Sequence, residues 1–424
     1  MNSRFVLIAA GTLLPAILAA AEFDVAAATN QAGLDLYRQL SAQRSDGNLV
    51  LSPYSIESAL ALAYAGAAGA TRTEMARVLH FAPDDAPVQQ AFAGLRAALD
   101  QIALRSQAAA DTRRGHGGEV DTIEWHAANR LFGQSGYAFR DSFVALMKDG
   151  YAAPFEAVDF RRDAKRVRGT INAWVEDQTR RKIRDLVPPD GVNAATRLAL
   201  VNALYLKAPW QKPFEKSATH PQPFSLPDGQ SREVPTMRAT ESLGYGAEDG
   251  LTLVALDYLG RDLQFLILLP DRDRPLDAVA ATLTPAHFAR WAQLGGQTNR
   301  KSISLFLPKF RVEGTTVPLG GALRALGMNT AFDLPPGSAN FDRIAPRKPD
   351  DYLAISEVFH QTFIALDEEG TEAAAATAVM MMTLSVAAPL PRPIEVRVDR
   401  PFLFAIQHRA SGTCLFLGRI SDPR

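Results

Sequence analysis

The chain is poor in cysteine: Cys414 is the only one among 424 residues, so no disulfide can form within the molecule. Cys414 opens a short apolar run, Cys414–Leu417, where a small buried core residue is a simpler interpretation than a reactive thiol. Without a cross-link, the hydrophobic core must hold the fold together. With 47% hydrophobic and 21% charged residues, the composition can supply such a core, and it argues against disorder.

An excess of charge of one sign is also lacking. The formal net charge is -1 at pH 7, and the sequence pI is about 6.7. A protein that binds nucleic acid or anionic membranes needs a basic surface, so we expect neither partner. Long apolar runs are missing as well, because no stretch after residue 21 reaches the roughly 18 residues of a membrane span. No Asn-X-Ser/Thr acceptor for N-glycosylation occurs.

Recognisable catalytic motifs are absent. The sequence contains no GxSxG, HExxH, GxxxxGK[ST] or GxGxxG pattern. Seven histidines occur without metal-ligand spacing: His80, His116, His126, His220, His287, His360 and His408. A catalytic triad can be assembled from residues far apart in a sequence, so an enzyme such as a hydrolase stays an alternative. We expect a protein that is not an enzyme and that needs no metal and no cofactor.

Residues 1–21 have the pattern of a secretory signal peptide. Arg4 supplies the positive start, an apolar segment follows from Phe5 to Leu18, and Ala19-Ala20-Ala21 fits a cleavage site of small residues. A short membrane anchor is the alternative, but the apolar segment is shorter than a spanning helix needs. We therefore predict a secreted or periplasmic protein that is not bound to a membrane once the signal has been removed.

Helical patterns dominate the first half of the chain, and strand patterns dominate the second. The expected helices include Ser55–Gly66, Val88–Leu104, Ala164–Thr179 and one that starts at the capping box Thr71–Glu74. A surface loop is expected at Gln107–Glu119. Strands are expected at Leu198–Leu206 and Leu251–Leu269, whose long apolar runs are typical of buried strands, and at Ser302–Phe310, which alternates. Further strands are expected at Ile394–Val398, Phe402–Ile406 and Thr413–Ile420. This segregation indicates an α+β fold, and the lack of a repeat or long linker favours one domain over residues 22–424.

The most informative segment is Glu368–Thr377, which reads EEGTEAAAAT. By propensity alone, its alanines favour a short helix or an inert linker. The segment lies, however, between a strand-like stretch at 355–366 and a run that contains Pro389, Pro391 and Pro393. Small residues in this place allow another interpretation, because no bulky side chain would stop the segment from entering a packed sheet.

This segment resembles the hinge of the serpins, a family of inhibitors of serine proteases. Other segments resemble the same family in the same order: NLVLSPYSIESALALAYAGA, INAWVEDQTRRKIRDLV, LALVNALYLKAPWQKPF, LPKFRVEG, ISEVFHQTFIALDEEG, and VDRPFLFAI with LFLGRI. The resemblance covers nearly all of the chain after residue 21. It implies an α+β serpin fold with three β-sheets, about nine helices and an exposed reactive loop at about residues 368–393.

In serpins, a target protease cleaves this loop, and the hinge side then enters the main sheet as a new strand. The resemblance assigns the hinge role to Glu368, Gly370, Thr371, Glu372, Ala373, Ala374, Ala375, Ala376 and Thr377. Gly370 would let the backbone turn into the sheet. Alternate residues of a strand share a face, and the face expected to enter the core holds only Thr371, Ala373, Ala375 and Thr377.

The spacing of inhibitory serpins, counted from Gly370, places the cleaved bond between Leu384 and Ser385. Leucine suits the apolar specificity pocket of chymotrypsin-like, elastase- or cathepsin-G-like, or subtilisin-like proteases. Met380–Met382 are nearby alternatives of similar character. No Arg or Lys occurs in the loop before Arg392, so trypsin-like targets are disfavoured. The stretch beyond the bond is longer than the family usually has, which leaves the choice of protease open.

The resemblance also implies two sites in the main sheet. A polar cluster that helps the serpin sheet to open is matched by Ser52, Ser55, Asn172 and His360. A satisfied hydrogen-bond network of the core would explain the same residues, and both interpretations can hold together. Trp210 matches a tryptophan at the top of the sheet, where simple core packing is the alternative.

The sequence thus predicts a suicide-substrate inhibitor of serine proteases. We expect a monomer whose partner is the target protease, bound through a covalent acyl complex. A non-inhibitory serpin that acts as a binding or chaperone module is the alternative. Such members often carry bulky, charged or proline residues at the inward-facing hinge positions, and this hinge has none there.

Overall fold

The computed structural model describes residues 23–43, 47–114, 121–313, 316–372 and 392–423, so the predicted signal peptide lies outside the described residues. Within these ranges the chain forms nine α-helices: α1 (Val25–Gln43), α2 (Pro53–Gly66), α3 (Gly69–Val78), α4 (Asp85–Arg114), α5 (Asp141–Tyr151), α6 (Phe160–Gln178), α7 (Leu276–Thr282), α8 (Pro285–Trp291) and α9 (Gly320–Ala325). Single 3-10 turns are formed at Lys216–Ala218, Gln297–Asn299 and Thr330–Phe332.

The strands of the described chain are β1 (Leu49–Leu51), β2 (Glu124–Gln134), β3 (Phe155–Val158), β4 (Leu198–Pro209), β5 (His220–Ser225), β6 (Ser231–Glu248), β7 (Leu251–Asp257), β8 (Leu263–Pro270), β9 (Arg300–Pro308), β10 (Phe310–Glu313), β11 (Val317–Pro318), β12 (Phe359–His360), β13 (Phe363–Leu366), β14 (Gly370–Thr371), β15 (Ile394–Arg397), β16 (Phe402–His408) and β17 (Cys414–Ile420). The apolar run predicted at 251–269 is an antiparallel hairpin, β7 and β8. The positive φ angles of Gly260 (85°) and Arg261 (65°) turn the chain between these strands.

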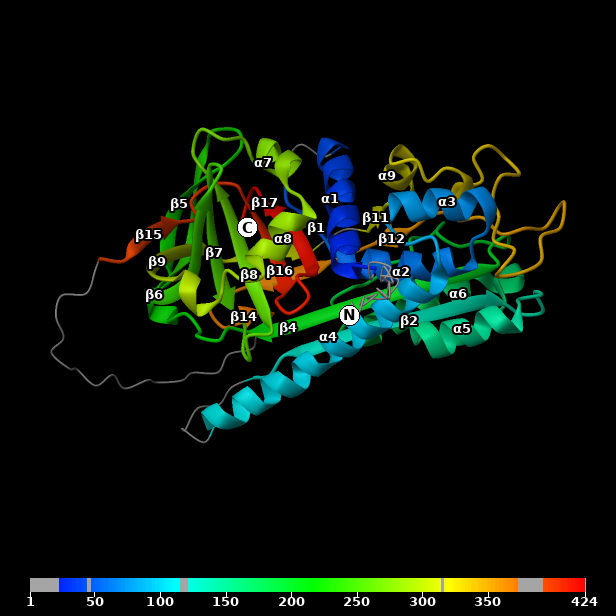
Figure 1. The fold of residues 1–424 in the computed structure, drawn as a ribbon, viewed down its shortest axis with the longest axis horizontal. Coiled ribbons are helices and arrows are strands. Elements are labelled where there is room, and N and C mark those ends of the chain that lie inside the picture. Colours follow the sequence, from blue (N-terminus) through cyan, green and yellow to red (C-terminus); the bar gives the residue numbers. More distant parts are fainter. Residues whose placement is uncertain (1–22, 44–46, 115–120, 314–315, 373–391, 424) are drawn as a thin grey trace, which may run out of the picture.

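These strands form three sheets, as predicted (Figure 1). The nine-stranded sheet has the order β1-β17-β16-β8-β7-β6-β9-β15, with β5 beside β6. The six-stranded sheet has the order β10-β13-β14-β4-β2-β3, and β11 pairs with β12 in the third. Every residue of β8, β16 and β17 is buried, and their sequences are mostly apolar, with Gln264, Gln407, His408 and Arg419 as the buried polar exceptions.

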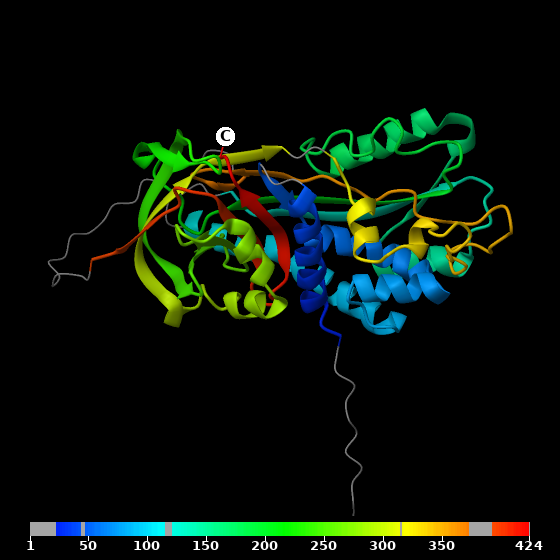
Figure 2. The ribbon, with the colours of Figure 1, turned by 90° about the horizontal axis from the view of Figure 1, so that it is seen from above.

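The six-stranded sheet lies between helices on both faces. On one face, α6 packs through Val167, Ile171 and Val175, which recur every four residues, against Phe132 and Val201 of the sheet. On the other face, α2 contacts β4 and is buried on nearly all sides, as its almost continuous apolar sequence requires. Figure 2 shows α6 above the sheet and the blue helices below it.

Two local expectations were wrong. Part of the predicted surface loop, residues 107–114, is the last section of α4, because this alanine-rich segment favours a helix and Ala110 is fully buried. The helix predicted to start at the capping box Thr71–Glu74 instead starts at Gly69. Thr71 Oγ1 accepts a hydrogen bond from the Asn340 amide, so it binds a distant loop rather than its own helix end.

Candidate functional site

The base of the predicted hinge forms a strand inside the six-stranded sheet. Gly370 and Thr371 form β14, which is antiparallel to both of its neighbours. Thr371 pairs with Leu366 of β13 on one side and with Ala208 of β4 on the other. A side chain at residue 370 would place its Cβ 2.2 Å from the Ala208 carbonyl oxygen, so only glycine fits this close approach.

This placement corrects the expectation that the whole hinge lies outside the sheet. In the described structure, β4 and β13 are connected through β14, and both offer backbone groups that a third strand can satisfy. The first hinge residues therefore already occupy a strand position. The other predicted hinge residues, 373–377, and the predicted scissile pair Leu384 and Ser385 lie outside the described residues.

Below β14, Thr371 points into an aromatic cluster. Its hydroxyl is hydrogen-bonded to the phenol of Tyr258, which is fully buried. The Tyr258 ring stacks on Trp210 with a centroid distance of 4.6 Å and an interplanar angle of 11°. Trp210 also contacts the segment before β14, because its indole Nε1 donates to the Asp367 carbonyl at 3.0 Å and its amide donates to that of Glu369 at 2.8 Å. Trp210 therefore lies beside the hinge base and contacts it through both its backbone and its side chain.

Two acidic residues just before β14 are paired with lysines of other segments. Lys309 Nζ lies 2.7 Å from a carboxylate oxygen of Glu368, and Lys216 Nζ lies 3.1 Å from one of Glu369. Burial alone would raise the pKa of Glu368, but the hydrogen bonds from Lys309 and Thr219 outweigh it, so the pKa is lowered. Glu368 is therefore ionised at neutral pH and fixes the start of the hinge.

Three of the four residues predicted to form a polar cluster do come together beneath the sheet. The Ser52 amide donates to His360 Nε2 at 3.1 Å, and the Ser55 amide donates to Ser52 Oγ at 3.2 Å. Ser52 is the N-cap of α2, and its hydroxyl donates to the Leu415 carbonyl of β17 at 2.7 Å. Desolvation lowers the pKa of buried His360 to about 4, so this imidazole is neutral at physiological pH.

Asn172 lies apart from that cluster, on the opposite face of the sheet. Its carboxamide makes two hydrogen bonds with Val187: Nδ2 donates to the carbonyl at 3.0 Å, and Oδ1 accepts from the amide at 2.9 Å. Val187 belongs to the segment that connects α6 to β4. The predicted residue thus anchors this connection to α6, rather than joining the histidine.

Comparison with known proteins identifies the family. A family model described as serpin (serine protease inhibitor) matches residues 27–423. The chain belongs to the serpin family. An uncharacterized serpin-like protein of Thermococcus kodakarensis is 35% identical over 405 residues, which cover 95% of this chain and 87% of that protein. A leukocyte elastase inhibitor of Sus scrofa is 34% identical over 406 residues, which cover 94% of this chain and all of the relative.

Solved structures agree with this assignment. A cleaved serpin, Serpin 42Da, superposes with a TM-score of 0.77 at 28% identity, over 95% of this chain and 99% of that one. Native protease nexin-1 with heparin gives a TM-score of 0.77 at 26% identity, over 94% of this chain and 99% of its own. The predicted serpin fold is therefore confirmed, and so is the prediction of membership in a family of inhibitors that are not enzymes.

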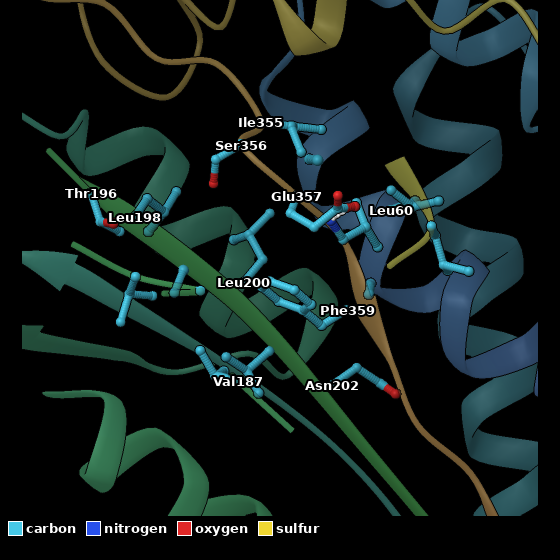
Figure 3. A pocket seen from close by; sticks show the side chains of 18 of the residues that line it. Leu60, Val187, Thr196, Leu198, Leu200, Asn202, Ile355, Ser356, Glu357 and Phe359 are labelled. Carbon is cyan, nitrogen blue, oxygen red and sulfur yellow. Dashed lines mark hydrogen bonds between the residues drawn. The ribbon is translucent and has the colours of Figure 1, made fainter. Parts of the chain in front are cut away.

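In this serpin, a cavity of about 310 Å³ lies between β4 and the segment that leads into β12 (Figure 3). One wall is the first half of β4, which contributes residues 198–202 and Leu204. The opposite wall is the segment that runs into β12 and includes Ile355 and Phe359. Because β14 is antiparallel to β4 and pairs Gly370 with Pro209 and Thr371 with Ala208, a strand that continued β14 would run toward Leu198 and reach this cavity.

Several residues of the serpin site were not predicted from the sequence. Asn202 accepts a hydrogen bond from Ser55 Oγ and donates one to Asn129 at 2.9 Å, so it connects α2, β4 and β2. Asn202 had a detectable signal, since it is the only polar residue in the apolar run LALVNALYL. Tyr258 and Lys309 had no such signal in the sequence, because their partners, Thr371 and Glu368, lie far away along the chain.

Neither a membrane span nor a metal cluster is found in the part of the serpin that the structure describes. No helix there combines the length and apolar character needed to cross a bilayer. The same residues contain no group of three or more His, Cys, Asp or Glu side chains placed to hold a metal ion.

Proposed function

We propose that this serpin is a suicide-substrate inhibitor of serine proteases with chymotrypsin-like, elastase- or cathepsin-G-like, or subtilisin-like specificity. One observation carries the proposal: the hinge base, Gly370–Thr371, is already a strand between β13 and β4. The sheet thus has a position for the loop. The residues that would follow β14, Ala373–Ala376, are small enough to enter the same position without overpacking.

The proposed reaction begins as ordinary proteolysis. The protease serine Oγ attacks the carbonyl carbon of Leu384, and the proton of the serine passes to the protease histidine. The bond between Leu384 and Ser385 breaks, the new amine of Ser385 takes the proton, and Leu384 stays bound to the protease as an ester. Water would normally hydrolyse this ester. Here the freed loop extends β14 along the cavity first, carries the protease with it and stops the second half of the reaction.

A denaturing gel tests this function. Incubation with chymotrypsin should yield a covalent band at the summed mass of serpin and protease, whereas chymotrypsin whose serine has been blocked should yield none. A Leu384→Arg variant should lose the complex with chymotrypsin and form one with trypsin, because the new side chain suits an acidic specificity pocket. Quantitative cleavage of the wild type without any complex would favour a non-inhibitory serpin. If Leu384→Arg still formed its complex with chymotrypsin and not with trypsin, the scissile bond would lie elsewhere in the loop.

We also propose that the protein is exported through the segment 1–21. The basic start, the apolar middle and the small residues Ala19–Ala21 support this localisation. Expression in a bacterial host should release a protein whose first residue follows the alanines, as seen by N-terminal sequencing. A full-length chain that keeps Met1 and stays inside the cell would contradict the export.

A further inference from the structure

Glu372 marks the point at which the docked hinge ends. Its amide still donates to the Ala365 carbonyl of β13 at 2.8 Å, which extends the pairing of β14 by one hydrogen bond. Its φ angle, however, is +51°, in the left-handed region that residues other than glycine rarely adopt. The backbone therefore departs from strand geometry at this residue, and only other contacts can hold it there.

Those contacts are made by the carboxylate. Lys182 Nζ lies 2.8 Å from Glu372 Oε1, and the Tyr205 hydroxyl donates to the same oxygen at 3.3 Å. The Glu372 side chain is only 12% exposed. Burial raises its pKa, and the hydrogen bond and charge of Lys182 act against that rise. A carboxylate this deeply placed needs its cation, because an unpaired buried charge is strongly unfavourable.

The two partners of Glu372 come from a strand of the sheet and from a connecting segment. Tyr205 belongs to β4, one neighbour of β14. Lys182 belongs to the connection between α6 and β4, and its ammonium also lies 5.0 Å from the ring centroid of Phe363 in β13, the other neighbour. The carboxylate thus joins the hinge to β4 through Tyr205 and to the α6–β4 connection through Lys182, which in turn contacts β13.

We infer that Glu372 is a positioning residue, which acts through Lys182 and Tyr205 to keep the hinge base docked in register before any protease arrives. The inference rests on the proposed inhibitory function. Insertion of the loop must outrun hydrolysis of the acyl-enzyme, and the slow part of forming a strand is bringing its first residues into place. A hinge that is already paired with β13 and β4 has completed this slow step. A larger share of the reactions with protease should then end in a covalent complex, and a smaller share in cleaved serpin.

Three variants test the inference with chymotrypsin. Lys182→Met leaves the Glu372 carboxylate without its cation, so the hinge should leave the sheet and the stoichiometry of inhibition should rise at least threefold. Glu372→Ala removes both side-chain contacts of the hinge base, so it should raise the stoichiometry of inhibition to a similar extent. The double variant Lys182→Met/Glu372→Gln should return to within twofold of the wild type, because an amide can still accept from Tyr205 and can be buried beside methionine more readily than a carboxylate. Lys165→Met, on the exposed face of α6, is the matched control and should behave as the wild type.

Tryptophan fluorescence gives a second measurement that does not need a protease. Undocking removes Thr371 from Tyr258, which stacks on Trp210, so Lys182→Met should change the emission and Glu372→Gln should reverse that change. The change should vanish in a Trp210→Phe background. Lys182→Met with wild-type stoichiometry and emission, or a double variant as impaired as Lys182→Met, would overturn the inference. Cleavage of the wild type without a complex would overturn the proposed function, and any role of Glu372 in inhibition with it.

Discussion

A single substitution at Thr371 tests the proposed strand insertion directly. Its side chain is 3% exposed and bonded to Tyr258 under the sheet, so an arginine there would have to bury an unpaired charge. We predict that Thr371→Arg turns the inhibitor into a substrate: chymotrypsin cleaves it, and the covalent band falls at least tenfold on a denaturing gel. Thr371→Val keeps the shape and should still inhibit. An arginine variant with the stoichiometry of the wild type would refute insertion at this position.

Glu57 has no evident role in the loop mechanism, yet its burial should make stability depend on pH. It is 1% exposed in α2, and neither carboxylate oxygen has a hydrogen-bond partner in the described structure. Burial raises its pKa well above the ordinary 4.5. The folded protein therefore holds this proton more tightly than the unfolded chain, and stability falls as the pH rises above 4.5, by about 1.4 kcal/mol per pH unit until the folded pKa is reached.

We accordingly predict that Glu57→Gln raises the thermal midpoint by a few degrees at pH 8 and changes it little at pH 4, where the glutamate is mostly protonated in both states. Scanning calorimetry at one scan rate measures the difference. Glu313→Gln, at an exposed position, is the control and should show no such pH dependence. Equal midpoints for Glu57→Gln and the wild type at pH 8 would mean that Glu57 finds a partner.

At the scale of elements, the contact between α2 and β4 ties the sheet to the helix beneath it. The hydroxyl of Ser55 in α2 donates to Asn202 of β4 and so links the two elements. We predict that Ser55→Ala lowers stability by about 1 kcal/mol, the usual worth of one buried hydrogen bond. Thermal melting of the uncleaved protein measures the loss, with the exposed Ser231→Ala as the control. A midpoint equal to that of the wild type would show that this bond does not hold the sheet.

The sequence predicted most elements because their patterns are local. The apolar run of β4 and the four-residue recurrence in α6 gave both elements nearly at their observed positions. The errors have a common cause in contacts between distant segments. Thr71 and Glu74 form a capping-box pattern, but Glu74 accepts hydrogen bonds from the Asn329 and Thr330 amides, so neither side chain caps the helix. The end of α4 is likewise secured by the burial of Ala110.

The same limit applies to the candidate site. The hinge and the positions of Ser52, Ser55, His360 and Trp210 could be found because a recognisable family pattern carries them in order. The docking of Gly370–Thr371 could not, because a strand of two residues has no periodicity and depends on β4 and β13 leaving room between them. Lys182 was likewise beyond reach, since its partner Glu372 is far away in the sequence.

At the scale of the whole molecule, the proposed mechanism requires a folded chain that can still gain a strand. If about a dozen residues after Glu372 pair with β13 and β4 at roughly 1 kcal/mol net each, insertion contributes on the order of 10 kcal/mol. That is comparable to the stability of a typical domain. Such a difference between the intact and the cleaved protein is large enough to displace and distort an attached protease.

The thermal midpoint before and after cleavage of the loop tests this claim most directly. The protein would be nicked by limited proteolysis, the position of the cut confirmed by mass spectrometry, and both forms melted at the same scan rate. The account predicts that the nicked form melts about 10 °C or more above the intact form, because the freed loop has joined the sheet. A nicked form that melts at or below the temperature of the intact protein would contradict it.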